Sequence, residues 1–113
     1  FETAFRGVKR AWYVEYETGS DSPARVVAKK HKGLAGLSSI YNRHFPEATE
    51  FRVIFFCPSD GWRDALRNEF KGKGCAEFCV FFSTPKVKPD TFLHESLLYT
   101  VDRGPLPFLP KPT

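Results

Sequence analysis

Two glutamates separated by one residue are the part of the chain with the clearest chemical potential. Glu15 and Glu17 lie in the run Ala11–Thr18 (AWYVEYET), which is rich in aromatic and β-branched residues and predicts a strand. Side chains alternate along a strand, so both carboxylates leave the same face, about 7 Å apart. Two like charges this close are costly unless a cation joins them. Because Mg²⁺ prefers carboxylate oxygens and often takes only one or two from the protein, Glu15 and Glu17 are candidate Mg²⁺ ligands.

A lysine in the next predicted element is the candidate third member of this site. On a helix, Lys30 falls within the apolar stripe formed by Val27, Leu34, Leu37 and Tyr41. A lysine in a sheet-facing stripe has a burial cost that a carboxylate partner would offset. Helical side chains lean toward the helix N-terminus, which is the end nearest the predicted strand tip. We therefore expect the Lys30 ammonium to reach back to the two glutamates.

Two carboxylates, a divalent cation and a lysine form a constellation that cleaves phosphodiesters. The metal activates water and stabilises the leaving oxygen, and the lysine orients water or neutralises developing charge. On this hypothesis Glu15, Glu17 and Lys30 are catalytic. The alternative is a structural ion pair between Lys30 and either glutamate, or edge glutamates that simply face water. The residue types alone leave both open.

The elements that must position these residues alternate along the chain. Phe1–Phe5 is a candidate hairpin partner of the first long strand, and Ser22 followed by Pro23 predicts a helix start. The order β-α-β-α-β predicts an α/β fold with a mostly parallel or mixed sheet, with ligands outside the carboxyl ends of the strands. The predicted elements are strand Ala11–Thr18, helix Pro23–His44, strand Phe51–Cys57, helix Trp62–Lys71 and strand Ala76–Ser83.

The C-terminal part is less regular in pattern. Phe92–Val101 fits either a short helix or a strand, and the proline-rich stretch from Gly104 predicts irregular structure. We expect one α/β domain over residues 1–104 and a proline-rich tail over residues 105–113. The chain begins at Phe1 and contains no Met, so we expect it to be a piece of a longer protein.

Composition excludes several classes of protein. The 113 residues are 42% hydrophobic and 27% charged, which is the composition of one folded domain and not of a disordered chain. No apolar run is long enough for a membrane span, and no secretory signal pattern opens the sequence. Three cysteines without a framework spacing predict reduced thiols and a cytoplasmic location.

The charge balance permits contact with nucleic acid. Seventeen Lys and Arg residues against thirteen Asp and Glu residues give a net charge of +4. Basic residues gathered on one surface would add salt-dependent affinity for DNA phosphates. The alternative is that these basic residues form a solvated helix face and bind no DNA. The candidate DNA-contacting residues are Lys29, Lys32, Arg43 and Arg63.

Residues 11–67 resemble the plasmid replication-relaxation proteins, a family similar to the restriction-endonuclease-like (PD-(D/E)xK) fold. The family hallmark is a strand ending in Glu-x-Asp, then Arg-Gly-Thr, then a helix with Lys and Tyr. This sequence has YVEYETGS, a helix carrying Lys30 and Tyr41, the strand FRVIFFC and the helix WRDALR, in which Arg63 opens the helix. Glu17 replaces the Asp and Thr18 replaces the Arg. In nuclease relatives the lysine follows the acid by two residues, a position that Glu17 occupies here.

The resemblance implies a restriction-endonuclease-like core that acts on plasmid or mobile-element DNA with Mg²⁺. It implies DNA as a partner, together with replication or mobilisation proteins, and Glu2 is the candidate for the acid of a preceding strand. The alternative is a catalytically inert DNA- or protein-binding module of the same fold.

Overall fold

A mixed four-stranded sheet forms the centre of the molecule. The computed structural model describes residues 1–90, 92 and 95–108, apart from the side chain of Ser38. β1 pairs antiparallel with β2, whereas β2, β3 and β4 run parallel. This arrangement confirms the α/β class, the mixed sheet and the predicted N-terminal hairpin. The strands, in their order across the sheet, are β1 (Glu2–Phe5), β2 (Val8–Tyr16), β3 (Glu50–Cys57) and β4 (Cys79–Ser83).

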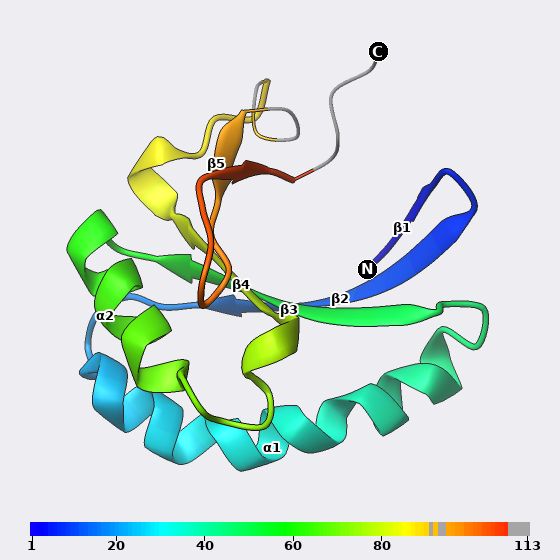
Figure 1. Ribbon diagram of the computed structural model, residues 1–113, viewed down its shortest axis with the longest axis horizontal. Coiled ribbons are helices and arrows are strands. Elements are labelled where there is room, and N and C mark those ends of the chain that lie inside the picture. Colours follow the sequence, from blue (N-terminus) through cyan, green and yellow to red (C-terminus); the bar gives the residue numbers. More distant parts are fainter. Residues whose placement is uncertain (91, 93–94, 109–113) are drawn as a thin grey trace.

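Both α-helices cover the same face of this sheet, as Figure 1 shows. Helix α1 (Pro23–His44) connects β2 to β3, and helix α2 (Asp60–Phe70) connects β3 to β4. Successive parallel strands advance across the sheet in one direction, so two right-handed crossovers place their helices on one side. Within the described part of the chain, neither helix is long and apolar enough to cross a lipid bilayer.

The start of each helix follows from its capping residue. The Ser22 hydroxyl accepts a hydrogen bond from the Arg25 backbone N–H at 3.3 Å, and Pro23 occupies the first turn. The Ser59 hydroxyl accepts from the Trp62 N–H at 3.2 Å, so α2 begins at Asp60, slightly before the predicted start. The predicted bounds of the first helix are confirmed.

The opposite face of the sheet is covered by the C-terminal part of the chain. β5 (Ser96–Leu98) pairs antiparallel with β6 (Leu106–Pro107), and Phe108 is only 6% exposed. The prediction of irregular structure from Gly104 is therefore wrong for these residues. The physical reason is that the helices leave this apolar face open, so aromatic side chains from the end of the chain pack on it. The aromatic members of this layer are Trp12, Phe56, Phe82, Phe92 and Phe108.

The predicted strand Ala76–Ser83 is shorter than expected. Residues Ala76–Phe78 form a 3-10 turn, η1, and pairing with β3 begins only at Cys79. From this turn the Phe78 ring packs on the Phe51 ring, with centroids 5.8 Å apart. A second 3-10 turn, η2 (Thr84–Lys86), follows β4. The apolar run is therefore divided between a strand and a turn, and the turn places the partly buried Phe78 side chain against the core from outside the sheet.

The three cysteines are core residues. Cys57, Cys75 and Cys79 are buried free thiols. Burial raises the pKa of Cys57 to about 12, and it raises the pKa of Cys79 as well. These thiols therefore stay protonated at neutral pH and serve as small hydrophobic side chains.

Candidate functional site

The structure brings Glu15, Glu17 and Lys30 together at the carboxyl end of β2. The Lys30 ammonium donates to Glu15 Oε2 at 2.7 Å and to Glu17 Oε1 at 2.9 Å. The two carboxylate side chains are 16% and 12% exposed, and the lysine side chain is 33% exposed. The expectation that Lys30 reaches back to both glutamates is confirmed. We call these three residues the acid–lysine site.

The periodicity of strand β2 and that of helix α1 bring the three residues of this site together. Glu15 pairs with Phe55 of β3, and the Glu17 N–H donates to the Phe56 carbonyl at 2.9 Å, which extends the strand pairing past Tyr16. Alternation then directs Tyr13, Glu15 and Glu17 toward the helix-covered face. On α1, Lys30 lies in the stripe that packs against the same face, where its head group meets the two acids near the rim of the sheet.

The electrostatics of the site favour a charged lysine. Burial lowers the pKa of Lys30, but the hydrogen bonds and charges of Glu15 and Glu17 outweigh it, so the pKa lies above its ordinary value. Interaction with the Glu15 carboxylate, together with burial, raises the pKa of the Tyr13 phenol. At neutral pH the site therefore holds an ammonium and a neutral phenol around two carboxylates.

The donor set of the site suits a hard divalent cation. Two carboxylates from one strand are oxygen donors of the kind that Mg²⁺ binds, and Mg²⁺ in proteins usually keeps several waters. Among the residues that the structure describes, no group of three or more His, Cys, Asp or Glu side chains is placed to hold a metal ion. A cation at this site would have only Glu15 and Glu17 as protein ligands, with water completing the shell. Lys30 meets the same two oxygens that a cation would take.

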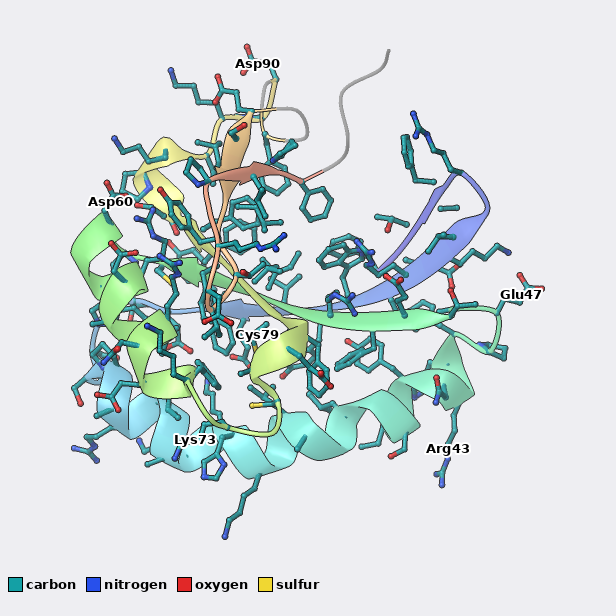
Figure 2. The ribbon with its side chains drawn as sticks, in the orientation of Figure 1. Arg43, Glu47, Asp60, Lys73, Cys79 and Asp90 are labelled. Carbon is teal, nitrogen blue, oxygen red and sulfur yellow. The ribbon has the colours of Figure 1, made fainter. Side chains whose placement is uncertain are left out.

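Helix α1 carries a basic outer face. Its 22 residues include no Asp or Glu. Lys29 donates to Asp21 at 3.0 Å, whereas Lys32 and Arg43 are exposed and form no ion pair with any residue in the described ranges. Figure 2 shows Arg43 pointing away from the sheet. We call Lys29, Lys32 and Arg43 the basic helix face.

The spacing along this face matches an extended polyanion. Lys32 and Arg43 are eleven residues apart, about three turns, which places them on one side of the helix at about 16 Å. A row of cations at this separation can contact several phosphates of one nucleic-acid strand. The three residues predicted to contact DNA from this helix thus share an exposed surface.

Arg63, the fourth predicted DNA contact, lies elsewhere and is buried. It is 7% exposed. Its Nε donates to Asp64 at 3.0 Å and its Nη1 donates to Asp60 at 3.2 Å. Its guanidinium lies 3.8 Å from the centre of the Tyr99 ring. Arg63 therefore packs α2 against the chain that follows β5, and the structure does not bring it to the basic helix face.

Sequence reasoning missed the groups around Arg63. A pocket there is lined by Ser83 and Lys86, among others. Ser83 had a usable signal, because it is the polar residue that ends a buried parallel strand, and ligands gather at such ends. Tyr99 had none, since it lies in the segment whose pattern fitted either a helix or a strand.

Comparison with known proteins adds no relative to this description. No family model, no curated protein and no solved structure matches the chain. The function must therefore be argued from the geometry of the site and from the pattern of its residues.

Proposed function

We propose that this chain is a DNA-acting, nuclease-like domain of a plasmid or mobile-element replication or mobilisation protein, with a restriction-endonuclease-like core and a cytoplasmic location. The observation that carries the proposal is the convergence of Glu15, Glu17 and Lys30 at the carboxyl end of a parallel strand. A basic helix face on the next element supports DNA as the substrate, because it supplies cations for the phosphate backbone.

Each part of the site has a role in phosphodiester cleavage. Glu15 and Glu17 would hold Mg²⁺, which when bound supplies Lewis-acid stabilisation of the negative charge that develops on the phosphate. Lys30 neutralises negative charge beside the same carboxylates, and its flexible stem lets the ammonium follow the reacting group. Lys32 and Arg43 contact the DNA backbone and fix its position on the domain.

A plasmid-nicking assay tests this proposal. We expect the chain to nick supercoiled plasmid in Mg²⁺ or Mn²⁺, and Glu15→Gln and Glu17→Gln each to abolish nicking while DNA binding is retained. Glu47→Gln is the matched control, since this exposed glutamate pairs with Lys9 far from the site. Nicking that survives in both site variants would contradict the assignment of the acids.

A second candidate function is favoured by one observation. Lys30 already bonds both carboxylates, so the site is satisfied without a metal. A catalytically inert module that docks on DNA or on a replication protein would have this arrangement. Its signature is DNA binding without nicking in either metal, with binding unaffected by Glu15→Gln.

The salt dependence of binding tests the part that both candidates share. Lys32→Gln and Arg43→Gln should each weaken DNA binding and reduce the slope of log K against log salt by about 1. Lys29→Gln should do less, because Asp21 already pairs with this lysine. Fluorescence anisotropy with a labelled duplex from about 50 to 200 mM salt measures the slope. Absence of binding at the lowest salt would contradict the nuclease-like candidate and the DNA-docking form of the inert module.

A further inference from the structure

A small polar pocket lies at the carboxyl end of β4, separated from the acid–lysine site by β3. Its volume is about 210 Å³. It lies between α2, the η2 turn and the chain around β5, so three segments distant in sequence converge on it. Asp60 marks the α2 side of this region in Figure 2. The polar residues that line it are Asp60, Arg63, Ser83, Lys86, Ser96 and Tyr99.

Three hydrogen-bond donors in this pocket have no acceptor among the residues that the structure describes. Ser83 is 3% exposed, and its hydroxyl has no partner among the described residues. Arg63 uses Nε and Nη1 on the two aspartates, which leaves Nη2 without an acceptor in the same part of the chain. Lys86 forms no ion pair with any described residue. Arg63 and Ser83 are buried residues and Lys86 lies at the exposed rim, so together they present donors to a ligand that accepts hydrogen bonds.

Charge and size narrow the class of ligand. Arg63 and Lys86 each contribute a positive charge to the lining, and Asp60 contributes a negative one, which leaves a net positive charge. The Asp60 side chain is 51% exposed and already bonds Arg63, so water screens its repulsion of an anion. The pocket is smaller than the roughly 300–1,000 Å³ typical of sites for organic ligands. A single tetrahedral oxyanion fits both constraints.

We propose that this pocket binds a phosphoryl group, held by Arg63 Nη2, the Ser83 hydroxyl and the Lys86 ammonium. A phosphoryl group offers several acceptor oxygens, and guanidinium and ammonium donors bind it through charge-assisted hydrogen bonds. Two sources share this chemistry: inorganic phosphate, and the terminal phosphate of a nucleic-acid strand. The second source rests on the proposed function, whereas the first does not, because no residue of the acid–lysine site takes part.

Titration of the full chain with inorganic phosphate tests the pocket. At constant ionic strength we expect saturable binding by calorimetry, with shifts of the Ser83 and Lys86 backbone amides in NMR spectra. Ser83→Ala and Lys86→Gln should each weaken binding by about 5- to 10-fold. Lys88→Gln is the matched control, an exposed lysine of the same connection that does not line the pocket. Because Lys86 is exposed, its variant tests the proposal even if Ser83→Ala fails to fold.

Oligonucleotides distinguish the two sources. Duplexes with a 5′-phosphate, a 3′-phosphate or hydroxyl ends are compared as ligands of the wild type and of Lys86→Gln. A preference for a phosphorylated end that Lys86→Gln removes assigns the pocket to a strand terminus, and binding of inorganic phosphate alone assigns it to the free anion. No binding of either probe, or binding that both pocket variants leave unchanged, overturns the proposal. A failure of plasmid nicking does not bear on these results.

Discussion

Two sites at the same end of the sheet are built from the same kinds of charged group. One site buries its anions, and the other buries its cation. In the acid–lysine site the carboxylates are 16% and 12% exposed and the ammonium is 33% exposed. In the cluster around Arg63, the guanidinium side chain is 8% exposed, whereas Asp60 and Asp64 are 51% and 53% exposed. The buried group in each site is the one that water cannot satisfy. The acid–lysine site therefore needs a cation, and the Arg63 cluster needs acceptors.

This difference explains why two sites built from similar residues favour different ligands. A buried carboxylate pair can exchange one cation for another, since the lysine on its flexible stem can move out to water. A buried guanidinium keeps its own place and can donate to a further anion from the nitrogen that the two aspartates leave free. Cys57 at the end of β3 lies within the field of both, because the Glu17 charge raises its pKa and the Arg63 charge lowers it, after burial as the larger cause.

The largest expected effect comes from removing the cation of the acid–lysine site. Lys30→Met leaves two largely buried carboxylates without a cation, and we expect it to lower the free energy of unfolding by about 3 kcal/mol. Urea unfolding followed by circular dichroism measures the change. Adding Glu15→Gln and Glu17→Gln to Lys30→Met should recover a large part of the loss, since neutral amides need no cation. If the triple variant recovers none of the lost free energy of unfolding, Lys30 acts through packing alone.

Removing the cation of the other site should cost less. Arg63→Met leaves Asp60 and Asp64 exposed to water, so the loss is mainly the contact with the Tyr99 ring, and we expect about 2 kcal/mol. Asp64→Asn, which removes an exposed acid from the same cluster, should cost less than about 1 kcal/mol. The same urea experiment compares the two variants. Equal losses in Asp64→Asn and Arg63→Met would contradict the contrast between buried and exposed partners.

The acid–lysine site was open to prediction because two short-range periodicities meet there. Alternation along β2 placed Glu15 and Glu17 on one face, and the helical stripe placed Lys30 on the facing side of α1. The bounds of α1 followed equally from local signals, with Ser22 and Pro23 at its start and Pro46 just past its end. Each of these inferences needed only residues close together in the sequence.

The Arg63 cluster depended on contacts that no local pattern carries. The buried residues of α2 are Arg63, Leu66 and Phe70, which lie at helical spacing. A pattern of apolar residues does not predict an arginine at a buried position. Its stacking partner Tyr99 joins the sheet edge through a bridge to Phe81, a pairing between distant residues. The burial of Phe108 against Trp12, at 4.7 Å between ring centres, is equally long-range. Proline content alone pointed to a tail.

A smaller effect sharpens the acid–lysine half of the comparison. If Glu15 and Glu17 can hold Mg²⁺, saturating Mg²⁺ should stabilise Lys30→Met more than the wild type, because the ammonium no longer competes. At ten times the dissociation constant the gain is about 1.4 kcal/mol. Thermal unfolding with and without MgCl₂, at matched ionic strength, measures it. Glu15→Gln/Lys30→Met is the control and should lose the gain. An equal response in all variants would contradict a metal site at these residues.

The smallest effects lie at the two ends of the pH range, and they separate the sites. Hydrogen bonding from Arg63 lowers the pKa of Asp64, so its contribution to stability is present above its unfolded pKa of about 3.9 and is lost as pH falls through the lower folded value. Lys30 has a raised pKa, so its contribution is complete below about 10.4 and is lost as pH rises through the higher folded value. Urea midpoints from pH 2.5 to 5 and from pH 9.5 to 11.5 report both losses. Asp64→Asn should reduce the loss on the acid limb and leave the alkaline limb unchanged, and Lys30→Met should reduce the loss on the alkaline limb. If Asp64→Asn also reduced the alkaline loss, the two sites would titrate as one.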